Sequence, residues 1–130
     1  MILDTSFLID IMKGNQAALS KVDEIESNGI EQVVPAMTLQ ELYIGVGASE
    51  LPAEERRKIE RVIETRPITP TTEEIARKAG KIDGQLRKDG RPINVGDASI
   101  GATGIVRDQP VVTGDPNHFE RIPDLDVETY

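Results

Sequence analysis

Apolar residues follow two different spacings along this chain, and stretches of the two kinds alternate. Short apolar runs bounded by turn residues predict strands at 1–3, 32–35, 111–113 and 126–130, with 67–68 as either a strand or a connector. Segments with apolar residues every three or four positions predict helices at about 7–13, 15–28, 51–63 and 95–106, and further helices opening at Thr38 and Thr71. Alternating strands and helices predict an α/β domain.

Helix boundaries are marked by side chains that can bond to free backbone groups. Thr38 with Glu41 and Thr71 with Glu74 have the spacing of a capping box. Gly90 is predicted to end the helix that opens at Thr71, and Pro92 blocks its continuation. The helix between Thr71 and Gly90 has a clear apolar stripe, formed by Ile75, Ala79, Ile82 and Leu86. The helix predicted at 15–28 has an apolar face formed by Leu19, Val22 and Ile25.

Four acidic residues stand where the chain passes between apolar and polar segments: Asp4, Glu41, Asp97 and Asp115. Asp4 and Asp115 follow predicted strands, and ligands of parallel sheets bind at the carboxyl ends of strands. Two such charges repel by about 4 kcal/mol at ~4 Å and an effective dielectric of ~20, so a converged site needs protons or a divalent cation. Ligands that are all oxygen favour Mg²⁺ or Mn²⁺, and these ions favour phosphate chemistry.

Each of these acids also has an ordinary structural explanation. Asp4 could cap the next helix, Glu41 could be the partner of Thr38 in a capping box, and Asp115 could form a turn before Pro116. The sequence alone leaves these alternatives open.

Asp97 has a more unusual setting, because Gly101 and Gly104 share its helical face. Glycine inside a helix costs about 0.5–1 kcal/mol relative to alanine, so the pair needs a reason. Close helix packing is one, and room for a metal and a phosphate is the other. His118, the only histidine, is interpreted as a turn or packing residue, and the remaining acids, Asp10 among them, as solvated charge.

Composition narrows the possible functions. With 130 residues, 38% of them hydrophobic, we expect a single domain over residues 1–130. There is no cysteine, which excludes disulfides and thiolate metal sites. The net charge of −8 argues against a broad basic surface for nucleic acid, and the charged run 54–61 is interpreted as a solvated helical face of paired opposite charges. We expect no signal peptide or membrane span, and hence a cytoplasmic protein.

Taken in order, several segments resemble the PIN-domain family, most closely the VapC-type toxin ribonucleases of type II toxin–antitoxin systems. The resemblance covers essentially the whole chain and is carried by 1–6, 39–42 with Gly45, 93–102, and 112–115 with His118 and Phe119. It implies a three-layer α/β/α sandwich with a central, mainly parallel sheet. It also implies a metal-dependent endoribonuclease, a homodimer, and a cognate antitoxin protein that occupies the acidic cleft.

Carried over residue by residue, the resemblance makes Asp4, Glu41 and Asp97 the core acids and Asp115 the fourth, more variable one. Ser6 and Thr113 match the accessory hydroxyls. The resulting hypothesis is that Asp4, Asp97 and Asp115 hold Mg²⁺ or Mn²⁺ and that Glu41 binds metal or positions the attacking water. The alternative is a non-catalytic module of the same fold, whose acidic pocket receives basic side chains of a protein partner. A third hypothesis, a phosphoacceptor receiver domain, is the least favoured of the three. Receiver domains need a lysine after a late strand, and none follows the predicted strand 111–113.

Overall fold

The computed structural model describes all of residues 1–130 and is built around short parallel strands. β1 (Ile2–Leu3) pairs with β4 (Val111–Val112), which pairs with β5 (Val127–Glu128); β2 (Val34–Pro35) pairs with β3 (Ile68–Thr69). A parallel bridge between Ile2 and Val33 joins the two sets, which gives the order β3-β2-β1-β4-β5. Every pairing is parallel, so the carboxyl ends of all five strands lie at one edge.

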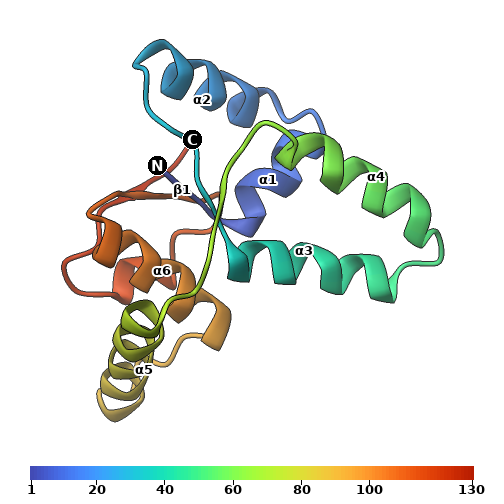
Figure 1. Cartoon of the computed structure of the whole chain (residues 1–130). Helices are drawn as coiled ribbons and strands as arrows, with labels where there is room; N and C mark the ends of the chain where they lie inside the picture. The colour runs from blue at the N-terminus through green and yellow to red at the C-terminus, as the bar shows by residue number, and fades with distance from the viewer.

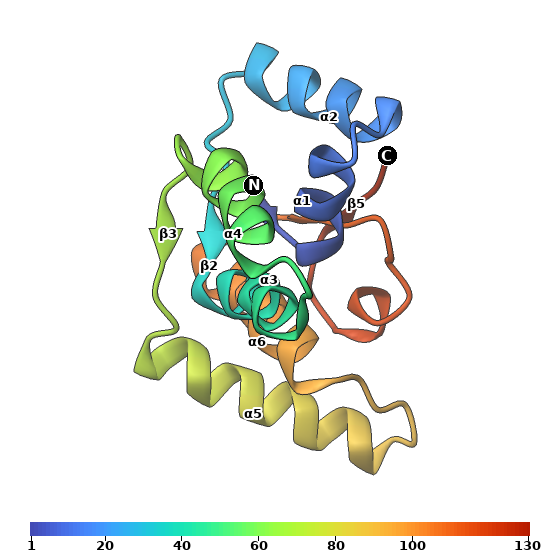
Figure 2. The ribbon, with the colours of Figure 1, turned by 90° about the vertical axis from the view of Figure 1, so that its right-hand side faces the viewer.

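Six helices and one 3₁₀ turn connect the strands: α1 (Thr5–Met12), α2 (Gln16–Ser27), α3 (Ala36–Ala48), α4 (Pro52–Ile63), α5 (Glu73–Lys88), α6 (Val95–Arg107) and η1 (Phe119–Arg121). They lie on both sides of the sheet, with α5 and α6 together on one side and α1, α2 and α4 on the other (Figures 1 and 2). The three-layer α/β/α sandwich predicted from the sequence is confirmed.

Alternation along the strands divides the core into two layers. Ile2, Val33 and Val111 point into the cluster beneath α5 and α6, whereas Leu3, Val34 and Val112 point into the cluster beneath α1, α2 and α4. All six are at most 1% exposed. Because both faces of the parallel sheet are covered, the inner strands β1, β2 and β4 are apolar and buried at both positions, whereas the edge strands β3 and β5 also carry Thr69 and Glu128.

Most predicted elements are confirmed, with three local corrections. The helix predicted to open at Thr38 begins at Ala36 instead, and Thr38 is buried within it. The cap of α5 is Thr72, one residue later than predicted, since Thr72 accepts the bond from Ile75 N. Leu19, expected on the buried face of α2, is 37% exposed; Ala18 and Lys21 are buried in its place.

No helix here has both the length and the hydrophobicity needed to cross a lipid bilayer.

Candidate active site

Asp4 lies directly after β1 and is only 5% exposed. It occupies the N-cap position of α1, but its side chain makes no capping hydrogen bond. Instead its Oδ2 accepts hydrogen bonds from Ser6 Oγ and from Thr113 Oγ1, both at 2.7 Å. The capping alternative for Asp4 is therefore wrong, and this carboxylate is held at the edge of the sheet by two hydroxyls.

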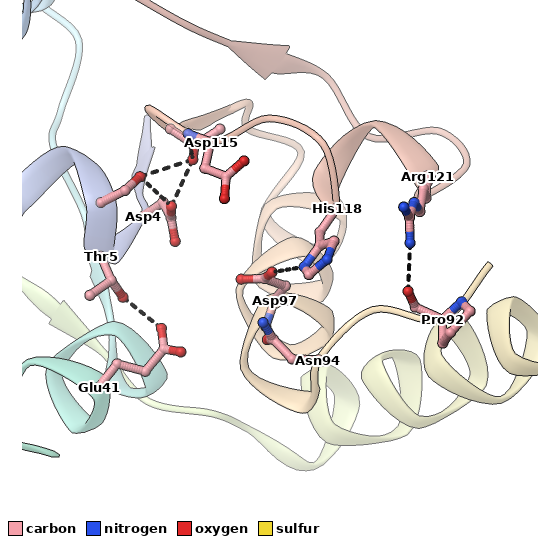
Figure 3. Close-up of polar contacts among 11 residues, drawn as sticks. Asp4, Thr5, Glu41, Pro92, Asn94, Asp97, Asp115, His118 and Arg121 are labelled. Atoms are coloured by element: carbon pink, nitrogen blue, oxygen red, sulfur yellow. Dashed lines mark hydrogen bonds and ion pairs between the residues drawn. The ribbon is translucent and has the colours of Figure 1, made fainter.

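The same two hydroxyls also fix the turn that carries Asp115. Thr113 Oγ1 accepts from the backbone N–H of Asp115 at 3.0 Å, and Ser6 Oγ accepts from the N–H of Gly114 at 3.0 Å. Ser6 and Thr113 are themselves 3.1 Å apart. The segments after β1 and β4 are thus joined through side chains, and this joint determines where Asp115 lies relative to Asp4 (Figure 3).

Glu41 lies in the second turn of α3 and is half-buried. Its Oε1 accepts a hydrogen bond from Thr5 Oγ1 at 2.6 Å, while Thr38 donates to the backbone oxygen of Leu3 at 3.0 Å. The capping-box interpretation is wrong, because Thr38 is already inside the helix. Burial is the largest cause of a raised pKa of Glu41; the hydrogen bond from Thr5 opposes the rise, and the charges of Asp4 and Asp97 add to it.

Asp97 lies in the first turn of α6, where Asn94 caps the helix. Asn94 Oδ1 accepts from the backbone N–H of Asp97 at 2.7 Å, and Asp97 Oδ2 lies 2.7 Å from His118 Nδ1. Burial raises the pKa of the Asp97 carboxyl, the hydrogen bond from His118 lowers it, and the charges of Asp4 and Asp115 raise it. A carboxylate in the first turn of a helix also faces the positive end of the helix dipole.

The contact between His118 and Asp97 was not predicted. His118 was interpreted as a turn or packing residue, and it does precede η1, but its ring is turned toward the acidic site. A sequence signal existed, since His118 follows Asp115 by three residues in the same connection. Figure 3 shows Asp4, Glu41, Asp97 and Asp115 around one region, with His118 at its side.

The structure brings the four predicted acids to one edge of the sheet but does not bring them into direct mutual contact. No group of three or more acidic or histidine side chains converges closely enough to hold an ion. Asp4, Glu41 and Asp97 each bond to a donor of their own: the hydroxyls described above or His118. Mutual repulsion accounts for this open arrangement. The donor set itself, all carboxylate oxygen, is of the kind that hard divalent cations prefer.

The two glycines that share the helical face of Asp97 serve packing rather than ligand access. A side-chain carbon at Gly101 would meet the end of Ile122, and one at Gly104 would lie 2.9 Å from the backbone oxygen of Gln109. Gly96 is the glycine beside the acids: a carbon there would lie 2.5 Å from Glu41 Oε2. Of the two reasons left open, close packing is confirmed for Gly101 and Gly104.

The interpretation of Asp10 as solvated charge is wrong. Asp10 accepts a hydrogen bond from the hydroxyl of Tyr130 at 2.6 Å, and Tyr130 packs its ring against Phe7. Burial, followed by the bond to Asp10, raises the pKa of Tyr130. This pair lies beside Gly114, so it supports the turn that presents Asp115.

Fold and site together define an α/β protein with a carboxylate-lined site at the carboxyl edge of a parallel sheet. Within that class the chain belongs to the PIN domain family, which it matches over residues 1–125. It is similar to ribonuclease VapC19 of Mycobacterium tuberculosis, with 34% identity over 124 residues that cover 95% of each protein. The tRNA(fMet)-specific endonuclease VapC of Shigella flexneri is 26% identical over 128 residues, covering 98% of this chain and 96% of that one.

Solved structures agree with this assignment. VapBC-1 of nontypeable Haemophilus influenzae superposes with a TM-score of 0.84 at 28% identity and covers 98% of this chain and 96% of that chain. VapBC2 of Rickettsia felis, bound to a DNA fragment from its promoter, has a TM-score of 0.91 over 99% and 97% of the two chains. Because the two sequences are only 21% identical, this similarity shows a shared fold alone.

Proposed function

We propose that this protein is the toxin of a type II toxin–antitoxin pair and acts as a metal-dependent endoribonuclease of the VapC type. The observation that carries the proposal is the grouping of Asp4, Glu41, Asp97 and Asp115 at the edge of the sheet, in a chain similar to VapC ribonucleases along 95% of its length. The charge of Asp4 contributes to the raised pKa of both Glu41 and Asp97, so these carboxylates interact electrostatically.

In this proposal Asp4, Asp97 and Asp115 hold the cation, which is Mg²⁺ or Mn²⁺. The bound ion would supply a water of lowered pKa and would neutralise negative charge on the phosphate. Ser6 and Thr113 keep Asp4 fixed, since each donates a hydrogen bond to its Oδ2. His118 holds Asp97 in the same way from the opposite side.

Glu41 either binds the ion or positions the attacking water. Burial raises the pKa of Glu41, which makes its carboxylate a better proton acceptor. Attack of water on phosphorus breaks the P–O3′ bond, the water proton passes to Glu41, and the leaving 3′ oxygen takes a proton from solvent. The products are a 5′ phosphate and a 3′ hydroxyl, because the ribose hydroxyl is not the nucleophile.

The proposal includes a partner and an assembly. A cognate antitoxin would inhibit by placing Arg or Lys side chains against the acids, since carboxylates are strong acceptors for such donors. A homodimer and a cytoplasmic location, where RNA is available, belong to the same proposal. The solved relatives named VapBC support the antitoxin part.

The test is RNA cleavage by the purified chain freed of any partner. We expect cleavage of a structured RNA that starts on addition of Mg²⁺ or Mn²⁺ and stops with chelator. Asp97→Asn should lower the cleavage rate by more than about a hundredfold. Loss of a residue that only supports a metal ligand typically costs about 10- to 100-fold, so a larger loss indicates a direct role. Asp108→Asn is the matched control: it makes the same charge change at the other end of α6, in a left-handed position that asparagine tolerates.

Two outcomes would contradict the proposal. Full divalent-dependent cleavage by Asp97→Asn would refute the role of that carboxylate. No cleavage by the wild-type chain with either ion would favour the alternative, an acidic pocket that only binds basic side chains of a protein.

A further inference from the structure

α4 carries four basic residues, Arg56, Arg57, Lys58 and Arg61, together with the acids Glu54, Glu55 and Glu60. Its apolar side, with Ile59 and Val62, is buried against α1. Along the edge where α4 meets α1 there is a hollow of about 330 Å³, lined by Ile11, Met12, Lys58, Arg61, Val62 and Arg66. Three of the six lining residues are basic and none is acidic, in a chain with a net charge of −8.

A second hollow connects this basic region to the acids. It has a volume of about 260 Å³ between α1, α3 and α4, and its charged lining residues are Lys13, Lys58, Glu41 and Glu55. Met12 and Lys58 line both hollows. The two hollows are therefore adjacent and together extend from Glu41 past Lys58 to Arg61 and Arg66; we call the pair the α4 groove.

The cations of the α4 groove are only partly neutralised. Lys58 lies 3.4 Å from Glu55, and Arg61 has no carboxylate within ion-pair distance. Arg66 is half-buried and fixed by Gln32 at 3.0 Å and by the backbone oxygen of Val62; burial lowers the pKa of its guanidinium. The prediction of a face of paired charges on α4 is confirmed for Arg56 with Glu60 and for Lys58 with Glu55 but does not describe Arg61.

We infer that the α4 groove binds the sugar–phosphate backbone of the RNA strand that extends from the scissile phosphate; this inference rests on the proposed function. Charge complementarity favours a polyanion, because the outer hollow offers only cations and apolar carbon. The presence of Glu41 in the second hollow favours the substrate itself over an unrelated anion. Ile11, Met12 and Val62 provide an apolar floor for the ribose and base faces.

The groove also explains how an acidic protein can hold RNA. Phosphates close to the four acids are repelled unless a cation is present, so affinity must come from groups farther along the strand. Lys58 and Arg61 are three residues apart on α4 and are neighbours on the helix surface. Side chains with this spacing can contact successive parts of one backbone.

The experiment compares two double variants of the full chain, freed of any partner, with Mg²⁺ present. Lys58→Gln/Arg61→Gln removes two groove cations. Arg56→Gln/Arg77→Gln is the matched control, since it changes the net charge equally at two exposed residues that line neither hollow. KM and kcat are measured for a single-stranded RNA and for a dinucleotide, whose one phosphate occupies the acidic site and leaves none for the groove.

The groove variant should raise KM for the longer RNA by about two- to thirtyfold, as expected for two exposed charge contacts, and leave kcat unchanged. The slope of log KM against log salt should fall by about 1.4, or ~0.7 for each lost contact to a single strand. For the dinucleotide, the groove variant and the control should behave alike.

Each other outcome overturns a specific claim. Equal KM and equal salt slope in both double variants overturn the groove while leaving the nuclease proposal intact. If KM and the salt slope are equal in both double variants but the antitoxin inhibits the groove variant more weakly than the control, the groove binds the antitoxin instead of RNA. Absence of cleavage by the wild-type chain overturns the proposed function itself.

Discussion

Thr5 Oγ1 donates a hydrogen bond to Glu41 Oε1 across 2.6 Å, and this contact joins α1 to α3 at the candidate site. Thr5 directly follows Asp4, so one short segment supplies both an acid of the site and the donor that orients another. The bond also opposes the effect of burial on Glu41, since it stabilises the charged form.

Thr5→Val tests this contact because valine keeps the shape and removes the hydroxyl. We expect divalent-ion affinity and RNA cleavage to fall by about 10- to 100-fold, the usual cost of losing a partner of a metal-binding carboxylate. Isothermal titration with Mn²⁺ and initial cleavage rates measure the two effects. Thr65→Val, at an exposed position without a side-chain hydrogen bond, is the control. Unchanged ion affinity in Thr5→Val would separate Glu41 from the metal and leave it only the water-positioning role.

Thr113→Val removes a donor at the centre of the site. Thr113 is fully buried, donates to Asp4, and accepts from the N–H of Asp115. The variant therefore leaves the N–H of Asp115 without this acceptor and leaves Asp4 with Ser6 as its remaining donor. Chemical denaturation should show a loss of about 1–3 kcal/mol in the free energy of unfolding, together with a large loss of activity. Thr103→Val is a suitable control, since Thr103 is equally buried but donates only to the backbone oxygen of Ser99. Equal effects on activity in both variants would show that Thr113 matters only for folding.

The sequence predicted the order and type of the elements well because these depend on local periodicity. The apolar stripe of α5 can be buried only if the helix packs with that side against the sheet, and the apolar strands can be buried only inside the molecule. The structure confirms both predictions. Capping boxes were less reliable. Thr38 has the spacing of a cap, but it lies inside α3 and donates a hydrogen bond to the backbone oxygen of Leu3, thirty-five residues earlier. A contact between residues so far apart leaves no local sequence pattern.

The site shows the same limit. That Asp4 and Asp115 lie at one edge follows from their positions after parallel strands. The pairings of Thr5 with Glu41, His118 with Asp97 and Tyr130 with Asp10 each join distant segments, and a side-chain bond of this kind leaves no spacing signal. The sequence thus located the acids, whereas the residues that orient them were visible only in the folded chain.

Stability without divalent ions should depend on pH through Glu41 and Asp97. Burial and neighbouring acids raise the pKa of both above their ordinary values of 4.5 and 3.8. The folded state then binds more protons than the unfolded state, so their contribution is fully present below these ordinary values and is lost as pH rises through the raised ones. In chelator, the Tm of the wild-type chain should therefore fall more steeply above about pH 4 than that of Glu41→Gln/Asp97→Asn. Parallel Tm curves for the two proteins would exclude this coupling.

The same argument predicts that divalent ions stabilise the folded chain at neutral pH. A cation bound only by the folded state adds about 2.7 kcal/mol at a hundred times its Kd. We expect Mn²⁺ to raise the Tm of the wild-type chain and to leave that of Asp97→Asn nearly unchanged, as measured by differential scanning calorimetry. An equal rise in both proteins would place the ion elsewhere.

Glycines in α5 and α6 should respond to alanine in opposite directions. At Gly104 the new carbon would lie 2.9 Å from the Gln109 backbone oxygen and 3.0 Å from Leu125, and the backbone oxygen cannot move without disturbing the end of α6. Overpacking of this kind costs about 1–3 kcal/mol, more than the gain in helix propensity. Gly80 and Gly84 have open space around the same position, so alanine there should add about 0.5–1 kcal/mol each. Urea unfolding of Gly104→Ala and Gly80→Ala measures both signs, and a stabilised Gly104→Ala would show that α6 can shift away from β4 at little cost.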